Sequence, residues 1–195
     1  MVYSIFQFIK PILLTLILIG LLQVTGLWSS ASATAQLLMM KTGLLNVDIH
    51  EDKRPDGFDY SFTIKDLSGN KLSFKKYKGK VLFINLWATW CGPCKAEMPS
   101  IQSLSEKLKD EQVEFVMLSV DKEVALPKVK SYLQNNQFTF PVFMMNGYLP
   151  ELLQVPSIPT TFIVSKDGKI LMKEVGTRNY DTNKMVNFLK EQISK

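Results

Sequence analysis

The chain has 195 residues, of which 46% are hydrophobic and 21% are charged, and its net charge is +5. This length allows one domain with appendages, and the composition is that of an ordinary globular protein. Residues 1–35 contain a single charged residue, Lys10, so almost all of the charge lies in the rest of the chain.

Residues 1–35 have the features of an export signal. Lys10 precedes an apolar run from Pro11 to Leu22, and small residues follow it. Ala33-Thr34-Ala35 fits a signal-peptidase site, and Ala31-Ser32-Ala33 is a second candidate. The apolar run is at the short end for a membrane span. A cleaved signal peptide is therefore favoured over a retained N-terminal membrane anchor, and both alternatives export everything that follows.

Residues 36–57 read as a weakly structured lead-in and linker, and residues 58–195 are expected to form the folded domain. Tyr60–Ile64 and Lys71–Phe74 flank a turn signal at 66–70, so they predict a β-hairpin. The lysines that follow, within residues 75–80, are explained by a solvated face, and no nucleic-acid partner is predicted.

The centre of the chain combines a buried strand with the only two cysteines. The run from Val81 to Trp87 has the length and composition of a buried strand, and Cys91-Gly92-Pro93-Cys94 follows it at the start of a helix. This spacing puts the sulfurs one helical turn apart, close enough to bond. At the helix start, unpaired N–H groups and the helix dipole would stabilise a Cys91 thiolate as the attacking sulfur. Cys94, one turn deeper and shielded, would resolve the mixed disulfide.

Two other uses of this cysteine pair are disfavoured. A zinc site needs two further ligands, but the chain has no other Cys and only His50, which is predicted to be a surface residue, so no metal is expected. A purely structural disulfide gains little stability in so short a loop. Trp87 and Trp90 are expected to shield the pair from water on the strand side.

After the cysteines, helical and strand patterns alternate along the chain. Helices are expected at about 93–109, 127–136 and 181–193, and strands at 114–120, 140–144, 160–164 and 170–175. The order β-β-β-α-β-α-β-β-α predicts an α/β domain with a mixed central sheet flanked by helices and a site at the carboxyl end of a strand.

The residues around the two cysteines resemble those of a known family. Trp90-Cys91-Gly92-Pro93-Cys94-Lys95 after an apolar strand resembles the active site of thioredoxin. The acid and the proline in Cys94-Lys95-Ala96-Glu97-Met98-Pro99, and the lead-in from Phe62 to Gly79, are similar to the TlpA/ResA-type thiol-disulfide oxidoreductases. The resemblance covers Phe58 to Lys195, and it implies a thioredoxin-like fold with an N-terminal β-hairpin.

The resemblance also implies a client groove. Pro159 aligns with a proline that is cis and faces the cysteines in thioredoxin-like proteins. Ile158, just before it, would offer backbone groups to an extended client segment. Trp90, Gly92 and Pro93 complete the expected groove.

One position departs from thioredoxin, which has a buried acid six residues before the first cysteine. This chain has Asn85 there, which cannot carry a proton. Glu97 is the only acid close by in the sequence, one turn after Cys94 and able to approach it, and the resembling branch has its acid there. We therefore expect Glu97 to assist proton movement; the alternative is a solvated helix residue.

The function implied is an exported thiol-disulfide oxidoreductase in the periplasm or on the outer face of the cytoplasmic membrane, acting as a monomer without a cofactor. Its expected partners are client proteins with thiols or disulfides, such as apocytochromes c, and a membrane thiol carrier that supplies electrons. Three alternatives stay open: an oxidant that forms disulfides, a thiol peroxidase, and a non-catalytic client-binding module.

Overall fold

The computed structural model describes residues 57–195 continuously and, before them, residues 10–11, 13–15, 17, 20, 39–40, 42–43, 45–47 and 49. The predicted cleavage sites and His50 lie outside the described residues. Within the described part of the chain, no helix combines the length and the apolar character needed to cross a membrane.

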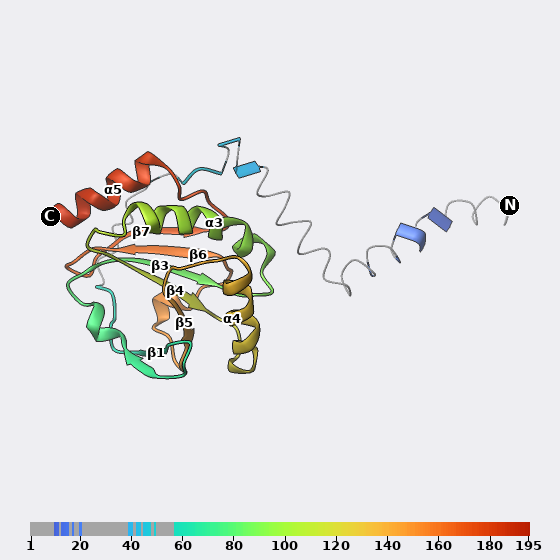
Figure 1. Ribbon diagram of the computed structural model, residues 1–195, viewed down its shortest axis with the longest axis horizontal. Coiled ribbons are helices and arrows are strands. Elements are labelled where there is room, and N and C mark those ends of the chain that lie inside the picture. Colours follow the sequence, from blue (N-terminus) through green and yellow to red (C-terminus); the bar gives the residue numbers. More distant parts are fainter. Residues whose placement is uncertain are drawn as a thin grey trace.

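A seven-stranded mixed sheet forms the centre of the domain, with helices packed around it (Figure 1). Its strand order is β2-β1-β5-β4-β3-β6-β7. The strands are β1 (Thr63–Lys65), β2 (Lys71–Ser73), β3 (Val81–Trp87), β4 (Val113–Ser119), β5 (Val142–Met145), β6 (Thr160–Val164) and β7 (Ile170–Val175). The helices are α3 (Gly92–Lys107), α4 (Leu126–Asn135) and α5 (Asn183–Ser194), with 3-10 turns η1 (Phe74–Tyr77), η2 (Glu123–Ala125) and η3 (Glu151–Leu153). The predicted mixed α/β architecture is confirmed.

Strand β3 lies near the middle of the sheet, parallel to β4 and antiparallel to β6. All seven of its residues are buried, as its continuous apolar sequence predicts for a strand covered on both faces. Because α3 begins five residues after β3 ends, the cysteine pair lies close to the carboxyl end of β3. The register aligns Asn85 with Thr161 of β6 and Trp87 with Ser119 of β4.

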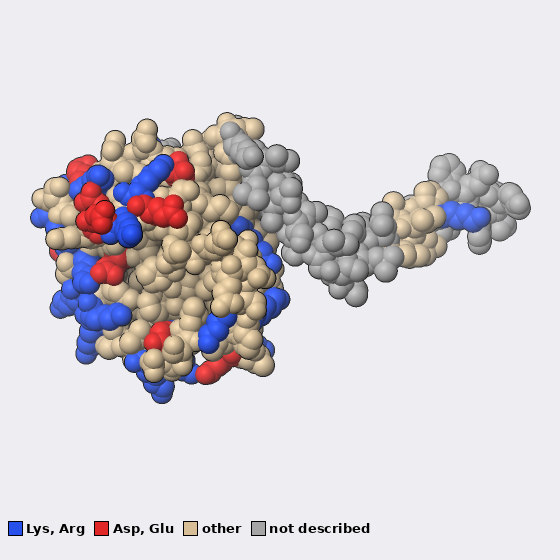
Figure 2. All heavy atoms as spheres, viewed as in Figure 1, with Lys and Arg blue, Asp and Glu red and all other residues tan. Residues whose placement is uncertain are grey.

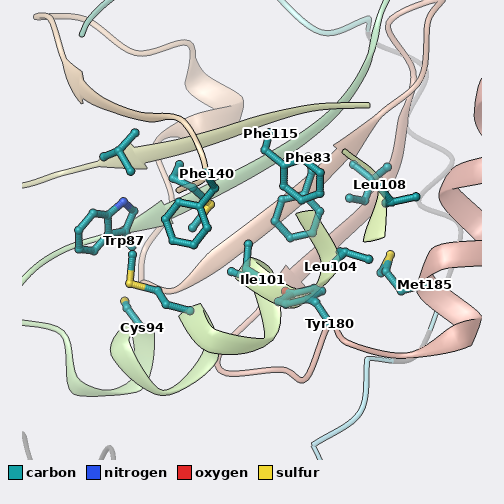
Figure 3. Packing of buried hydrophobic residues seen from close by; sticks show 14 of the residues in the cluster. Phe83, Trp87, Cys94, Ile101, Leu104, Leu108, Phe115, Phe140, Tyr180 and Met185 are labelled. Atoms are coloured by element: carbon teal, nitrogen blue, oxygen red, sulfur yellow. The ribbon is translucent and has the colours of Figure 1, made fainter. Parts of the chain in front are cut away.

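Alternate residues of β3 enter two hydrophobic clusters on opposite faces of the sheet. Phe83 and Trp87 belong to the cluster that also contains apolar side chains of α3, α4 and α5 (Figure 3). Cys94 and Trp87 lie at the same end of this cluster (Figure 3). Leu82 and Ile84 belong to the other cluster, which is closed by aromatic residues of the segment before β3. The second cysteine is thus part of the core rather than of the surface.

The predicted hairpin forms, but its first strand is shorter than expected. Only Thr63–Lys65 pairs with Lys71–Ser73, and β1 also pairs with β5. The preceding aromatic residues pack instead of extending the ladder: the Phe62 ring stacks on Phe74 with centroids 4.3 Å apart. Side-chain packing therefore sets the start of this strand.

The starts of β5 and α5 also differ from the predicted positions, each because of a nearby residue. The strand expected from residue 140 starts at Val142, after Pro141, which has no N–H to donate to a ladder. The last helix starts at Asn183 rather than at residue 181 because the Thr182 hydroxyl accepts a hydrogen bond from Met185 N at 3.1 Å and so caps the helix.

Part of the lead-in lies against the domain. Val47 is 3% exposed, and its N–H donates to Asn179 O at 3.2 Å, while Asn179 N donates to Leu45 O at 2.7 Å. On the face seen in Figure 2, charged side chains of both signs gather around α5, where Lys190 pairs with Glu111. Mixed charges of this kind are typical of a solvent-exposed surface.

Candidate active site

The two cysteines form a disulfide at the start of α3, with Cα atoms 5.3 Å apart. Cys91 is the N-cap residue, and its sulfur accepts a hydrogen bond from Cys94 N at 3.1 Å. Pro93 lies in the first helical turn, where a missing N–H has no helical partner to lose. Cys91 is 5% exposed and Cys94 is fully buried. The geometry of the pair thus gives the first sulfur both the helix N-terminus and the better access.

The loop before β6 lies against the first sulfur. The Ile158–Pro159 peptide bond is cis, as the resemblance implied. Ile158 O lies 3.8 Å from Cys91 Sγ. Pro159 is buried and Ile158 is partly exposed, so the residue that contacts Cys91 Sγ through its backbone is accessible in part from outside.

The two tryptophans occupy different environments, which corrects the expectation that both shield the pair from water. Trp87 is fully buried in the cluster, with its ring 5.9 Å from that of Tyr132. Trp90 is 61% exposed, because β3 ends at Trp87 and the turn that follows directs the later residue outward. Trp90 is therefore available for contact with another molecule.

An apolar groove of about 710 Å³ starts beside the cysteine pair. Trp90 and Ile158 form one part of its lining, and Tyr148, which is 67% exposed, lies in another. The remaining lining residues are also uncharged and come mostly from the segment between β5 and β6: Val120, Met145, Gly147, Leu149, Leu153, Gln154, Val155, Pro156 and Ser157. The expected groove residues Trp90 and Ile158 are thus joined by a loop that the sequence did not single out.

Glu97 is fully buried, which excludes the solvated-residue alternative. Its Oε1 accepts a hydrogen bond from Asn85 Nδ2 at 2.7 Å, and its Oε2 accepts one from Arg178 N at 3.2 Å. Burial raises the pKa of Glu97 to about 8, although both hydrogen bonds act in the opposite direction. A carboxyl group with such a pKa exchanges its proton near neutral pH. Its hydrogen bonds go to Asn85 and Arg178, not to a sulfur.

Residues 177–180 are hydrogen-bonded to α3, the helix that carries Glu97, and no sequence motif indicated these contacts. Thr177 Oγ1 donates to Pro93 O at 3.1 Å, and Tyr180 N donates to Ser100 Oγ at 3.1 Å. Burial and the nearby charge of Glu97 raise the pKa of Tyr180 well above its usual value. Asn85 Nδ2 also donates to Thr161 Oγ1 at 2.9 Å, so one side chain links Glu97 to β6. These partners are distant in sequence, and their residue types carry no motif.

The first comparison with known proteins concerns the family. A family model described as "AhpC/TSA family" matches residues 58–173, more than half of the chain. The chain belongs to the AhpC/TSA family. The matched range contains both cysteines, Glu97 and Pro159, but it ends before α5.

The chain is similar in sequence or structure to proteins named for thiol-disulfide exchange or for thioredoxin. It is 38% identical over 118 residues to the thiol-disulfide oxidoreductase ResA of Bacillus cereus, a match covering 60% of this chain and 66% of that protein. It is 34% identical over 116 residues to the thioredoxin-like protein YneN of Bacillus subtilis, covering 60% of this chain and 68% of YneN. A thiol:disulfide interchange protein of Chlorobium tepidum has a similar structure, with a TM-score of 0.56, 29% identity, and coverage of 71% of this chain and 98% of that one. The match to ResA spans slightly less than two thirds of that relative.

Proposed function

We propose that this protein is a thiol-disulfide oxidoreductase whose reacting groups are Cys91 and Cys94. The observation that carries the proposal is the placement of Cys91: its sulfur caps α3, accepts the Cys94 N–H, is bonded to Cys94, and lies 3.8 Å from Ile158 O. A helix N-terminus stabilises a thiolate at this position. The names of the relatives support the same activity.

Reduction of a client disulfide would proceed in two exchanges. The Cys91 thiolate attacks one client sulfur, a mixed disulfide forms, and the other client sulfur leaves as a thiolate that takes up a proton. The Cys94 thiolate then attacks Cys91 Sγ, which releases the client's first sulfur and forms the Cys91–Cys94 bond. Two electrons pass to the client, and the bonded pair seen in the structure is the oxidised end state.

Glu97 is the group we assign to the proton of Cys94. Both residues are buried one turn apart on α3, and bulk water reaches neither. Because burial raises the pKa of Glu97 to about 8, this carboxyl group can hold or release a proton near neutral pH. Glu97 would take the proton when Cys94 attacks and return it when the pair is reduced again.

The client would lie along the Ile158 backbone, with a neighbouring apolar side chain in the groove beside Trp90. The backbone carbonyl at Ile158 suits an extended segment, as in strand addition. The uncharged lining of the groove suits an aliphatic or aromatic side chain. Gly92 and Pro93 would form the edge of the same surface.

We also propose export through residues 1–35, with residues 36–57 as the lead-in and residues 58–195 as the active domain, working as a monomer. In an oxidising compartment a reductant needs electrons from a membrane thiol carrier, and apocytochromes c are suitable clients. Gly92-Pro93 between the cysteines places no cation or histidine beside Cys91, which favours a reductant over an oxidant.

The deciding experiment traps the mixed disulfide. Cys94→Ser should accumulate covalent complexes with client proteins, whereas Cys91→Ser, its matched control, should not. Labelling of Cys94 before Cys91 by iodoacetamide would refute the assignment.

The same purified protein separates the alternatives. A midpoint potential near that of thioredoxin, about −270 mV, supports the reductant, and one near that of DsbA, about −120 mV, supports an oxidant. Peroxide consumption that depends on Cys91 would indicate a thiol peroxidase. Client binding that survives replacement of both cysteines, without any exchange, would indicate a non-catalytic module.

A further inference from the structure

A second buried carboxyl group, Asp121, lies just beyond the end of β4 and takes no part in the steps above. Asp121 is 5% exposed. Its Oδ2 accepts hydrogen bonds from Thr89 N and from Ser119 Oγ, both at 2.8 Å, and its Oδ1 accepts one from Thr89 Oγ1 at 2.8 Å. Two of these three donors belong to Thr89, two residues before the reactive cysteine.

The loop that donates hydrogen bonds to Asp121 leads directly into Cys91. Residues 88–91 form a turn in which Cys91 N donates to Ala88 O at 3.1 Å, and Val120 N donates to Trp87 O at 2.8 Å. The parallel strands β3 and β4 are therefore joined at their carboxyl ends by one backbone bond and by both oxygens of Asp121. The next element is α3, whose first sulfur acts as the helix cap.

Asp121 is also held from its own strand end. Ser119 Oγ accepts a hydrogen bond from Asp121 N at 3.1 Å, which orients the carboxyl from its own strand end. On α3, Lys95 lies over the ring of Tyr132, 5.3 Å from its centroid. Burial and Lys128 lower the pKa of Lys95, and the charge of Asp121 acts in the opposite direction.

We propose that Asp121 is a positioning residue for disulfide exchange, fixing the Thr89 loop so that Cys91 Sγ stays at the N-terminus of α3 beside Ile158 O. The proposal rests on the exchange function proposed above. Asp121 acts through Thr89 and reaches neither sulfur with a hydrogen bond in the described residues. Without it, Thr89 N would be a buried donor with no partner, and the turn would relax toward water.

Two substitutions separate positioning from charge. Asp121→Ala removes all three accepted bonds. Asp121→Asn keeps an oxygen for Thr89 N and Ser119 Oγ, and its NH2 group can donate to the Thr89 hydroxyl, which is able to accept. Asp66→Ala is the matched control, because Asp66 also accepts three bonds in a turn, from Ser68 N, Asn70 N and Asn70 Nδ2, but in the β1–β2 hairpin.

The measurements use the full chain. In insulin reduction with dithiothreitol as the electron source, we expect kcat/KM to fall at least about tenfold in Asp121→Ala, because a small displacement of a reacting atom is enough for such a loss. Alkylation of reduced Cys91 by iodoacetamide should slow about threefold as the thiolate leaves the helix terminus. Asp121→Asn should recover most of both rates, and Asp66→Ala should change neither.

The rates of the Asp121 variants support or overturn the positioning role. An Asp121→Ala variant as fast as the unchanged protein overturns the proposal, and so does an Asp121→Asn variant as slow as Asp121→Ala, because charge would then be responsible. Should Asp121→Ala fail to fold, Thr89→Val decides: a several-fold slower alkylation supports the proposal, and an unchanged rate overturns it. If the unchanged protein does not reduce insulin, the proposed function fails, whereas the alkylation comparison still tests Asp121.

Discussion

Replacing Glu97 with Gln should make the stability of the protein much less dependent on pH. In the folded protein, burial raises the pKa of Glu97 from 4.5 to about 8. In the unfolded chain this carboxyl group loses its proton at its ordinary pKa. Between these two values the folded state binds more protons than the unfolded state, so the free energy of unfolding falls as the pH rises. The contribution of Glu97 is complete below the unfolded pKa and lost above about 8.

The size of the effect follows from the same shift. Each pH unit within the window changes the free energy of unfolding by up to about 1.4 kcal/mol, so a rise from about pH 5 to about pH 8 removes roughly 3–4 kcal/mol. Gln fills nearly the same volume and keeps an oxygen that can accept from Asn85 or Arg178 N. It has no proton to lose, so the variant should gain about this much relative to the unchanged protein over that range.

Urea unfolding at a series of pH values, with the disulfide intact, measures the difference between the two proteins. Glu106→Gln, on the exposed face of the same helix, controls for the chemical change itself. A Glu97→Gln difference that stays flat with pH, or that favours Glu at the alkaline end, would refute the reasoning from burial. The same variant should alter the pH profile of client reduction if Glu97 accepts the proton of Cys94 as proposed.

The other predictions concern the groove and the hydrogen bonds between residues 177–180 and α3. Trp90→Ala should raise the KM for a client protein several-fold and leave the free energy of unfolding nearly unchanged, because that side chain is 61% exposed; an unchanged KM with a lower Tm would contradict it. Ser100→Ala should lower the free energy of unfolding by about 1–2 kcal/mol, because it leaves Tyr180 N buried without its acceptor. Denaturant unfolding checks this value, and Ser103→Ala, at a partly exposed position of the same helix, is its control.

The sequence was sufficient to predict the central strand and the helix that begins at the cysteine pair. The apolar run of β3 and the cysteine spacing predict a strand, a turn and a helix cap, because these depend on residues a few positions apart. The central sheet followed from the alternation of strands and helices. The observed boundaries differ from the expected ones where a single side-chain contact decides them, as with the Thr182 cap of α5, which is local, and the stacking of Phe62 on Phe74 before β1.

The environments of the polar side chains could not be predicted in the same way. Glu97 is buried because Asn85 and Arg178, 12 and 81 residues away in the chain, meet it with donors. Asp121 is buried because Thr89, 32 residues away, does the same. A glutamate on a helix and an aspartate after a strand are ordinary surface residues in most sequences, so their residue types alone do not indicate burial.

The two buried carboxyl groups divide the requirements of disulfide exchange between them. In the proposed mechanism, Asp121 fixes the attacking sulfur by accepting hydrogen bonds from the loop before Cys91. Glu97, whose pKa burial raises to about 8, is the proposed proton acceptor for the resolving sulfur. Removing the first group should disturb geometry at every pH, whereas removing the second should disturb the pH dependence and leave the geometry intact. The two effects are therefore separable in one set of variants, and their combination should be close to additive if the loop and the helix act independently.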